Sequence, residues 1–587
     1  MVTPPLRHLP ARRATGVMVV VLIVVVSFVV RLVDVQIVRA DQLNDQARNK
    51  RSVAQELWAD RGQLVDREGA VLAANVARFN ITAAPVFAAT ATVDRDGTKQ
   101  RVTVEQALTE ISQVTGVDGG ALHRALTDHA DSDFAYLVKG VDIDTFRAVR
   151  ALKLPWVYFE RQSARSYPNG SVAGNVTGFV GTDGPQAGLE LMADECLAGV
   201  NGREVFERGA DGVRLPGSTV IESRPEPGSD VQLTIDRDLQ YLAQQALAEQ
   251  GTALRAQSAT AIVMDARTGE LLVVADWPSV DPNDVDGTDV AHLGSKAFTD
   301  SYEPGSTLKA VTAAALLDTH KADPSSRVTV PYSRSFPWGG RIKDATFHPT
   351  EQLTLTGVLR DSSNVGISLL GERLSADVRH DYLTRFGLND PTEVGFLGEP
   401  TAGIRQPSEW DRQTDINTMF GQGISTTAIH VASIFQTLAN HGVRMPVSLV
   451  KGCGEGPENS GGVQSGRQVV SAEAADTTLG MLEHVVTDGD LSEDLTLPGY
   501  RISAKSGTAE VALEGGGGYG SDFIVSVAGV APADDPRFVV VTTFTKPQVH
   551  KTSAAAAPTF NRLMGEALRM YRVPPSSEEA TPYPMTW

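Results

Sequence analysis

The first 55 residues divide into segments of different hydropathy. A predominantly apolar run covers residues 14–33, between an arginine-containing segment (residues 1–13) and Asp34, the first acidic residue. About 17–25 apolar residues are enough for a helix to cross a membrane, so this run predicts a transmembrane anchor. The basic residues before it predict a cytoplasmic N-terminus and an extracytoplasmic remainder. A cleaved signal peptide and a buried core helix are the alternatives for the same run.

The next segments predict a stalk, a first domain and a linker. Residues 34–55 are polar and compatible with a helical stalk. Residues 56–221 combine short β-like runs and turns with one helix at 104–114, where apolar residues recur at spacings of three and four. The segment 222–230 is rich in proline, glycine and charge, which indicates a boundary between two domains.

Residues 231–572 have helix and strand patterns at both ends and a helix-rich middle. A helix follows Asp236, whose carboxylate is a suitable N-terminal cap, and another begins near Pro558. Because strands from the two ends can share one antiparallel sheet, the pattern predicts an α+β fold. The expected strands are two within residues 260–276, joined by a turn at 267–269, and those at 523–531 and 537–545.

Composition restricts the class of protein. The chain has 587 residues, of which 42% are hydrophobic, and this excludes wholesale disorder and indicates several globular domains. Its net charge of 52 − 71 = −19 argues against a nucleic-acid partner, which would require a basic surface. Residues 573–587 carry four prolines and predict a disordered tail.

The two cysteines, Cys196 and Cys453, leave the redox compartment open. Two cysteines are too few for a disulfide scaffold, and these two lack the spacing of zinc ligands. They could form one bridge, but the sequence favours buried free thiols.

Three separated motifs carry the candidate chemistry, and the first is YEPGSTLK at residues 302–309. Pro304-Gly305 interrupts the chain, and the apolar run that follows predicts a helix beginning near Ser306. Ser306 and Lys309 then lie one turn apart on the same face. A serine hydroxyl becomes nucleophilic when a base removes its proton, and a lysine with a lowered pKa can act as that base. Alone, the S-x-x-K pattern is weak, because it occurs by chance in many proteins and is more often a capping serine beside a solvated lysine.

The second and third motifs add a hydroxyl, an amide and a second lysine. Ser362 and Asn364 follow an apolar helix-like run, and both side chains can face one cleft. In the KSGT motif at 505–508, Gly507 lets a ligand backbone approach a strand closely. Lys505 supplies a cation for a carboxylate and favours the neutral form of a neighbouring lysine. An edge strand here could accept a peptide through main-chain hydrogen bonds. Each motif alone is also compatible with a helix cap or a β-turn.

In the order S-x-x-K, S-x-N and K-[ST]-G, the three motifs form the set found in β-lactamases and penicillin-binding proteins. Over about residues 30–570 the chain resembles the class B penicillin-binding proteins, which are membrane-anchored D,D-transpeptidases. It is most similar to their septal, FtsI-type branch, with the elongation-specific branch as the alternative. The resemblance also extends to RGQLVDREGAVLAAN (61–75), RSYPNGSVAGNVTGFVGTDGPQAGLE (165–190), FGQGISTT and GVAPADDPR (529–537).

The resemblance implies a catalytic role for three residues. Ser306 would be the acylated nucleophile and Lys309 its general base, while Ser362 would relay a proton to the leaving D-alanine. These roles need no cofactor and no metal. His320 and His348 have no part in them and are expected to be structural or exposed.

The resemblance also implies a set of substrate-binding residues. Asn364 would position the donor peptide, and the third motif would hold the carboxylate of the substrate or of a β-lactam. The backbone N–H groups of Ser306 and Thr508 would form the oxyanion hole. Two residues depart from the family's common pattern, Ser506 in place of threonine and Thr427 in place of proline. The substrate-binding set is Asn364, Lys505, Ser506, Gly507 and Thr508.

At the level of domains, the resemblance implies a β-rich dimerisation domain, or pedestal, at 56–221 and a transpeptidase domain at 231–572. The expected substrates are peptidoglycan stem peptides ending in D-Ala-D-Ala, with β-lactams as inhibitors. Without a glycosyltransferase domain, the chain would need a SEDS-type, FtsW-like glycan polymerase and other divisome membrane proteins as partners. The expected location is the cell membrane, with a single span and an extracytoplasmic catalytic domain.

Other functions share parts of this pattern. A D,D-carboxypeptidase differs only in transferring the acyl group to water, and a catalytically inactive division scaffold would retain the fold. A β-lactamase would need a deacylation base, and no E-x-x-L-N pattern lies between the second and third motifs. The glycine run 515–518 is not followed by the GK[ST] of a phosphate loop and is expected to be a flexible connection at the cleft rim.

Overall fold

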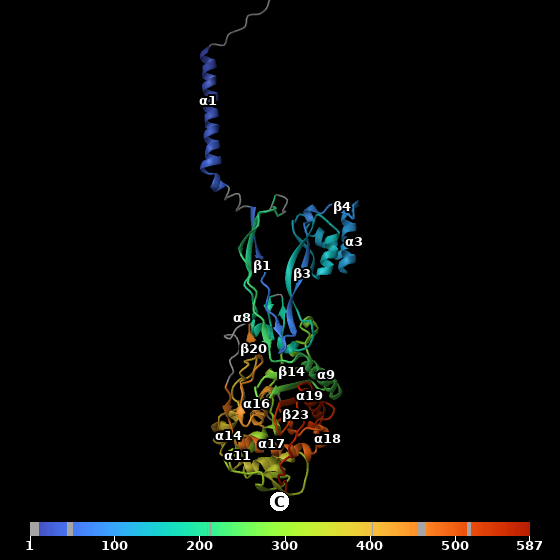
Figure 1. Cartoon of the computed structure of the whole chain (residues 1–587), viewed down its shortest axis with the longest axis vertical. Coiled ribbons are helices and arrows are strands. Elements are labelled where there is room, and N and C mark those ends of the chain that lie inside the picture. Colours follow the sequence, from blue (N-terminus) through green and yellow to red (C-terminus); the bar gives the residue numbers. More distant parts are fainter. Residues whose placement is uncertain are drawn as a thin grey trace, which may run out of the picture. The chain divides into compact units, whose positions relative to one another are not determined.

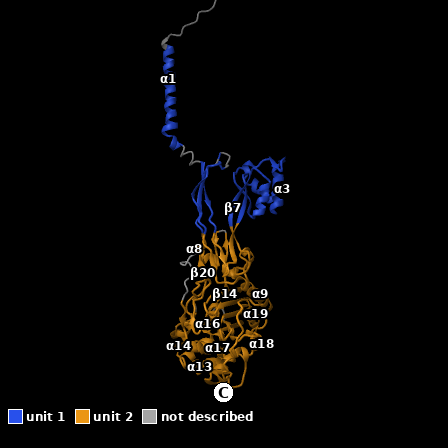
Figure 2. Cartoon of the chain, in the orientation of Figure 1, with its two compact units in different colours: residues 1–60, 77–163, 199–227 blue, residues 61–76, 164–198, 228–587 orange. Residues whose placement is uncertain are grey.

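The computed structural model describes residues 11–43, 51–181, 183–207, 209, 214–401, 403–454, 465–512 and 518–587. The chain forms two compact units, coloured separately in Figure 2, and each unit combines segments that are distant in sequence. The first unit contains residues 1–60, 77–163 and 199–227, and the second contains residues 61–76, 164–198 and 228–587. Parts of the predicted pedestal sequence therefore fold with the C-terminal unit.

The first unit begins with the helix α1 (Ala11–Val33), which matches the apolar run predicted at 14–33 (Figure 1). The most apolar 18-residue window of the helical stretch Arg13–Val38 has a mean hydropathy of 3.0, and the stretch is long and apolar enough to cross a membrane. Its apolar side chains are exposed, as expected of a helix whose solvent is lipid rather than a protein core.

The rest of the first unit contains an antiparallel sheet of β1, β10 and β11 and a separate region in which β3 pairs with β6 and β7. Helices α3, α4 and α5 pack in the second region around a core that includes Ile81, Ile111 and Trp156. The helix predicted at 104–114 is confirmed as α3, and Thr103 caps it. The elements are β1 (Ser52–Leu57), β3 (Val71–Ala83), β4 (Ala91–Arg95), β5 (Thr98–Val102), α3 (Val104–Thr115), α4 (Gly119–Thr127), β6 (Ala135–Val141), α5 (Ile143–Ala151), β7 (Val157–Ser166), β10 (Gly202–Glu207) and β11 (Val220–Ser223).

Strand β1 occupies part of the segment for which the sequence predicts a helical stalk. Ser52 pairs with Glu207 and Gln55 pairs with Glu204, so the last residues of that segment belong to a sheet. The partner strand lies about 150 residues further along the chain, and local polarity gives no signal of such pairing. Residues 44–50 of the predicted stalk lie outside the described part of the chain.

The second unit is built on a five-stranded antiparallel sheet in the order β14-β13-β24-β23-β22. The strands and helices predicted at both ends of residues 231–572 are confirmed, and Figure 1 shows green β14 and α9 beside red α19 and β23. Asp236 caps α9 by accepting hydrogen bonds from two backbone N–H groups, as predicted. The elements of the sheet layer are α9 (Arg237–Leu254), β13 (Ser258–Asp265), β14 (Leu271–Trp277), β22 (Ser503–Ala512), β23 (Tyr519–Ala531), β24 (Phe538–Thr545) and α19 (Ala557–Met570). The strand β12 (Val231–Leu233), which precedes α9, belongs to a different sheet.

Alternate residues of the sheet face two different helical layers, as the two-residue period of a strand requires. Ala261 and Val263 of β13 join the core formed with α9 and α19. Ile262 and Met264 join the core on the other face, where α16 packs. The helical middle of the unit consists of α10 (Lys296–Thr299), α11 (Lys309–Asp318), α12 (Leu355–Arg360), α13 (Asn364–Gly371), α14 (Ala376–Arg385), α15 (Arg412–Asn417), α16 (Ala428–Ala439), α17 (Ala472–Thr487) and α18 (Ser492–Leu495).

Small hairpins and short elements complete the second unit. The hairpin of β16 and β17 and the pair of β15 and β18 belong to the segment between α11 and α12. The remaining strands and helices are β2 (Leu64–Val65), α6 (Gly174–Thr177), β8 (Val180–Gly181), β9 (Gly184–Pro185), α7 (Gly188–Met192), α8 (Asp194–Leu197), β15 (Arg327–Val330), β16 (Ser333–Ser335), β17 (Arg341–Lys343), β18 (Glu351–Thr354), β19 (Val443–Arg444), β20 (Val450–Cys453) and β21 (Arg467–Gln468).

A buried ion-pair network joins the two segments that resemble pedestal signatures. The Glu190 side chain is fully buried, and its two carboxylate oxygens lie 2.8 Å from Nε of Arg61 and 2.7 Å from Nε of Arg165. Arg61 also pairs with Asp194, and Arg165 donates to the carbonyl of Gly62 at 2.7 Å. Removing one partner of a buried ion pair leaves an uncompensated charge, which costs about 3–5 kcal/mol. These segments are therefore held together within the second unit.

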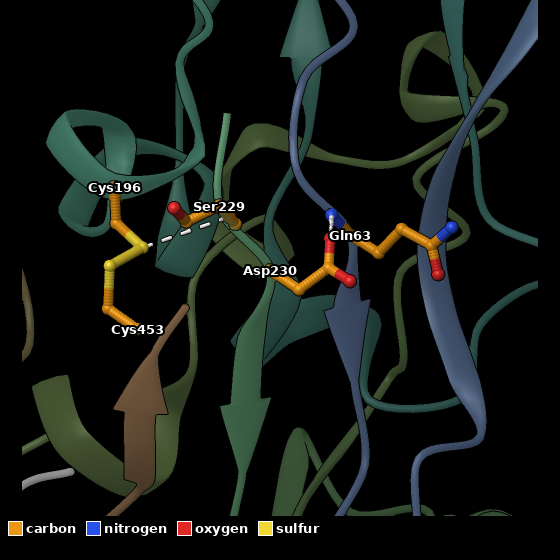
Figure 3. The surroundings of a disulfide bond; sticks show 5 residues. All are labelled: Gln63, Cys196, Ser229, Asp230 and Cys453. Atoms are coloured by element: carbon orange, nitrogen blue, oxygen red, sulfur yellow. Dashed lines mark hydrogen bonds between the residues drawn. A yellow bond between two sulfur atoms is a disulfide. The ribbon is translucent and has the colours of Figure 1, made fainter. Parts of the chain in front are cut away.

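Cys196 and Cys453 form a disulfide, which corrects the prediction of buried free thiols. Cys453 ends β20 and pairs in the sheet with Val231, while the Cys196 carbonyl accepts from the N–H of Ser229 at 2.9 Å. Figure 3 shows the segment with Ser229 and Asp230 beside the bridge, whose Cα atoms are 6.1 Å apart. The cysteines are 257 residues apart in sequence, so only the folded sheet brings them together.

The structure also differs from the predicted disorder of residues 573–587. The Met585 carbonyl accepts from the backbone N–H of Thr354 at 3.1 Å, and Thr586 bridges to Leu353. A Cβ at Gly357 would lie 2.1 Å from the Met585 carbonyl oxygen, so this glycine makes room for the tail. The guanidinium of Arg327 lies 5.1 Å from the ring centroid of Trp587. Main-chain pairing with β18 and close contact with Gly357 of α12 thus order a segment whose prolines alone favour disorder.

We expect the bridge to contribute to the stability of the second unit. A disulfide that closes a long loop restricts the unfolded chain, and its loss typically costs about 2–4 kcal/mol. The double variant Cys196→Ser/Cys453→Ser should therefore unfold at a lower temperature than the wild type, measured by calorimetry of the detergent-solubilised chain. Reductant should lower the midpoint of the wild type and leave that of the double variant unchanged. An unchanged wild-type midpoint in reductant would contradict this expectation.

Candidate active site

The first motif lies at a tight turn that precedes α11. Residues Gly305–Leu308 form a 3-10 turn, and the α-helix begins at Lys309, three residues after the predicted start. Gly305 has φ +56° and donates its N–H to the Gly421 carbonyl at 3.0 Å. A Cβ at Gly421 would lie 2.1 Å from the Gly305 carbonyl oxygen, so the FGQG segment and this turn require close backbone contact. The turn holds the partly exposed Ser306 at the surface of the unit.

The second motif forms the turn between α12 and α13. Ser362 has φ +56°, in the left-handed region that a residue with a side chain seldom adopts. Such a conformation costs about 1–3 kcal/mol and persists when the surroundings fix it. Here the backbone N–H of Ser363 donates to the Val358 carbonyl at 3.0 Å, and the Lys309 Nζ donates to the Ser362 carbonyl.

The Ser362 hydroxyl joins the three motifs. Nζ of Lys309 lies 3.3 Å from Oγ of Ser362, and Nζ of Lys505 lies 2.8 Å from the same atom. Lys309 is in α11, Ser362 precedes α13 and Lys505 is in β22, so three distant segments converge on one hydroxyl. The structure thus brings the first, second and third motifs together as the sequence predicted.

Both lysines are fully buried, and this changes their acid–base behaviour. Burial lowers the pKa of Lys309 well below its usual value, the charge of Lys505 lowers it further, and the Asp344 carboxylate partly opposes the shift. Burial also lowers the pKa of Lys505 to about 7. A lysine that loses its proton near neutral pH can accept one from a hydroxyl, which is the property a general base needs.

Asn364 of the second motif contacts a neighbouring hairpin. Its Nδ2 donates to the Lys343 carbonyl at 3.1 Å. The side chain remains partly exposed at the first position of α13. The amide is therefore fixed by the end of β17.

The third motif lies on β22, which is the last strand in the order of the five-stranded sheet, as expected of an edge strand. Lys505, Gly507 and Ala509 are buried, whereas Ser506 is partly exposed and Thr508 is exposed. A Cβ at Gly507 would lie 2.7 Å from Oγ of Ser526 and 3.2 Å from the Pro304 carbonyl oxygen. A side chain at this position would therefore collide with Ser526 of β23 and crowd the turn that carries the first motif.

A cavity of about 890 Å³ adjoins the motifs. It is lined by Glu303, three residues before Ser306, and by Glu510, two residues after Thr508. Oε1 of Glu303 accepts hydrogen bonds from the Gly423 N–H at 2.9 Å and from the Tyr519 hydroxyl at 3.2 Å. These carboxylates were not predicted, because nothing in their spacing distinguishes them from solvated surface acids.

Two further observations bear on the predicted site. Among the residues that the structure describes, no three histidine, cysteine or acidic side chains come together in a way that could hold a metal ion. The glycine run predicted as a flexible connection falls at 515–518, of which 515–517 lie outside the described residues.

Comparison with known families matches both parts of the chain. Residues 259–565 match the model described as the penicillin binding protein transpeptidase domain. Residues 56–233 match the penicillin-binding protein dimerisation domain. The first match alone spans half of the chain and contains all three motifs.

Whole-length relatives agree with these matches. The chain is 33% identical to penicillin-binding protein PbpB of Mycobacterium tuberculosis, over 97% of this chain and 86% of the relative. It is 29% identical to the peptidoglycan D,D-transpeptidase FtsI of Escherichia coli, over 93% and 90% of the two chains.

Solved structures give the same result. A peptidoglycan synthetase of Bifidobacterium adolescentis has a TM-score of 0.71 at 29% identity, covering 92% of this chain and all of the other. Penicillin-binding protein 3 of Mycobacterium tuberculosis, solved with aztreonam, has a TM-score of 0.67 at 27% identity, covering 91% of this chain and all of the other. The chain therefore belongs to the class B penicillin-binding proteins, the family of peptidoglycan D,D-transpeptidases.

Proposed function

We propose that the protein cross-links peptidoglycan stem peptides through an acyl-enzyme formed on Ser306. The observation that carries this proposal is the Ser362 hydroxyl held between two buried lysine amines, beside the turn that presents Ser306. One amine serves as the base, the hydroxyl transfers a proton, and the second amine supplies positive charge.

In the proposed acylation step, Lys309 accepts the Ser306 hydroxyl proton as Oγ attacks the carbonyl of the penultimate D-alanine. The oxyanion binds the backbone N–H groups of Ser306 and Thr508. As the tetrahedral intermediate collapses, the peptide bond breaks, and the proton passes through Ser362 to the leaving amine of the terminal D-alanine. The amine of a second stem peptide then attacks the ester, forms the cross-link and returns the proton.

Substrate binding in this proposal uses the edge of β22. A donor peptide can add to this strand through main-chain hydrogen bonds, which gives affinity without dependence on side-chain sequence. Lys505, Ser506 and Thr508 hold the terminal carboxylate, Gly507 allows close approach, and Asn364 positions the peptide. A β-lactam acylates Ser306 without losing a leaving group, and the structures of the tuberculosis relative with ampicillin and aztreonam support this reactivity.

The proposal includes a single-pass membrane protein with a cytoplasmic N-terminus. The helical stretch Arg13–Val38 is long enough to be the anchor, and the arginines before the apolar run favour the cytoplasmic side. The disulfide supports an extracytoplasmic second unit, since such bonds persist in oxidising compartments. Residues 56–221 would then serve as the pedestal and residues 231–572 as the transpeptidase domain.

We further propose a septal role, supported by the 29% identity to FtsI over nearly the whole chain. Neither matched family model is a glycosyltransferase, so glycan strands would come from a separate SEDS-type, FtsW-like polymerase among the divisome membrane proteins. Elongation-specific cross-linking is the alternative that localisation can distinguish.

The nucleophile assignment predicts that Ser306→Ala removes covalent labelling by fluorescent penicillin and fails to support growth when it replaces the wild type. Alanine has no hydroxyl at this position, so no ester can form with penicillin. Gel fluorescence of membranes measures the labelling, and Ser325→Ala, at an exposed serine of the same unit, should label normally. Growth with unchanged labelling of Ser306→Ala would refute the enzymatic proposal.

The pKa shift of Lys309 predicts a pH effect of Lys505→Gln. Removing the positive charge of Lys505 raises the pKa of Lys309, so more of this base is protonated in mildly acidic solution. The acidic limb of the penicillin acylation rate should therefore move to higher pH. The rate at its maximum should also fall roughly ten-fold or more, since a charged hydrogen bond to the carboxylate contributes about 1.5–3 kcal/mol. An unmoved acidic limb would contradict the assignment of Lys309 as base.

The septal proposal predicts the distribution of a fluorescent fusion in growing cells. We expect fluorescence to concentrate at the division site during constriction and the polymerase to co-purify with the fusion from solubilised membranes. Uniform labelling of the lateral wall would favour the elongation-specific alternative. A fusion carrying Ser306→Ala serves as control, because localisation by partners does not require acylation.

A further inference from the structure

The left-handed backbone of Ser362 needs support from both sides of the turn. On the N-terminal side, the end of α12 provides it: the N–H of Ser362 donates to the Leu359 carbonyl at 3.2 Å. On the C-terminal side, the support comes from outside the motif. There the hydroxyl and backbone of the next residues are held by Asp344, which directly follows β17.

Each carboxylate oxygen of Asp344 accepts a hydrogen bond from the segment that follows Ser362. Oδ2 accepts a hydrogen bond from the Ser363 hydroxyl at 2.6 Å, and Oδ1 accepts from the Val365 N–H at 2.9 Å. The residue is buried, with 6% of its surface exposed. The Ser363 hydroxyl in turn accepts from the Gly366 N–H at 2.8 Å, so it connects the carboxylate to the first turn of α13. A single buried carboxylate thus holds Ser363 and Val365, two of the three residues that follow Ser362.

The carboxylate is itself held in place. Nε2 of His348 lies 3.0 Å from Oδ2 of Asp344, and Nδ1 of His348 lies 2.7 Å from the Pro349 carbonyl oxygen. The Glu351 carboxylate lies 3.5 Å from Nδ1 of His348. Burial lowers the pKa of His348, but the hydrogen bonds to Pro349 and Asp344 and the two nearby carboxylates raise it overall. His348, which was predicted to be structural or exposed, therefore has a structural role. It holds the Asp344 carboxylate, which in turn holds the segment after Ser362.

We propose that Asp344 is a positioning residue for acylation, which holds the turn so that the Ser362 hydroxyl faces both Lys309 and Lys505. The inference rests on the function proposed above, because it concerns the rate at which Ser306 is acylated. Asp344 does not touch the substrate in this scheme. It acts through Ser363 and Val365 on the orientation of Ser362.

The position of Asp344 also gives it an electrostatic effect that a purely structural residue would lack. Its negative charge favours the protonated form of Lys309, whereas burial and Lys505 favour the neutral form. Replacing Asp344 by asparagine should therefore move the acidic limb of acylation to lower pH. This is the opposite direction from the one expected for Lys505→Gln.

The test measures acylation of the full-length chain by fluorescent penicillin between pH 5 and pH 9, together with thermal unfolding. We expect Asp344→Asn to fold and to be acylated roughly ten- to hundred-fold more slowly, since small misplacement of a catalytic group has effects of this size. The acidic limb of the pH profile of Asp344→Asn should lie at lower pH than that of the wild type. Asp344→Glu keeps the negative charge on a side chain that is one methylene longer. The acidic limb of its pH profile should therefore lie near that of the wild type, while its acylation rate remains low.

Two controls complete the design. Ser363→Ala removes the hydroxyl that Asp344 holds but keeps the carboxylate, so we expect a slower rate with an unmoved acidic limb. Asp377→Asn removes an exposed carboxylate in α14 and should leave both the rate and the limb unchanged. If Asp344→Asn does not fold, Asp344→Glu and Ser363→Ala decide the question: reduced acylation rates in folded protein support the proposal, and wild-type rates overturn it.

The outcomes separate this inference from the proposed function. If Ser306→Ala is still labelled, the proposed function fails, whatever the Asp344 variants do. If Ser306→Ala is inert but folded Asp344→Asn reacts at the wild-type rate with an unmoved limb, only the role of Asp344 is overturned. A lower unfolding temperature of Asp344→Asn with unchanged kinetics would likewise overturn it, because the residue would then serve stability alone.

Discussion

The contact on which the site depends is the Ser362 hydroxyl shared by the buried amines of Lys309 and Lys505. Two lysines that are removed from water and placed near one another cannot both keep their protons at little cost, so their pKa values fall. That destabilisation of charge is what makes a lysine useful as a base near neutral pH. The rest of the second unit has to hold three distant segments so that this unfavourable arrangement persists.

Several independent constraints hold them. The five-stranded sheet places β22 beside the turn of Ser306, and glycines at 421 and 507 allow close contacts where side chains would clash. Elsewhere in the same unit, the buried Glu190 with its two arginines and the disulfide of Cys196 and Cys453 join segments that are far apart in sequence. Core packing, ion pairs and a covalent bond therefore all stabilise the unit. They are weakened by different conditions, so no single change of condition removes all three.

Much of the fold could be predicted from local sequence pattern. The anchor helix, α3, α9 with its Asp236 cap and the strands β13, β14, β23 and β24 each lie where periodicity placed them. The three motifs also identified the residues that converge, because a serine, two lysines and an edge strand have recognisable sequence signals. The prediction failed where a segment's state depends on a remote partner: β1 pairs with β10, and the proline-rich C-terminus pairs with β18.

The sequence by itself therefore determined most element types, the family and the chemical groups of the site, since these follow from residue identity and spacing. Tertiary structure alone decided that the cysteines are bridged, that Asn364 contacts Lys343 and that Asp344 supports the turn of Ser362. These features depend on distances between residues separated by some 20 to 260 positions. Such distances are fixed by the packing of sheets and helices, to which local hydropathy is insensitive.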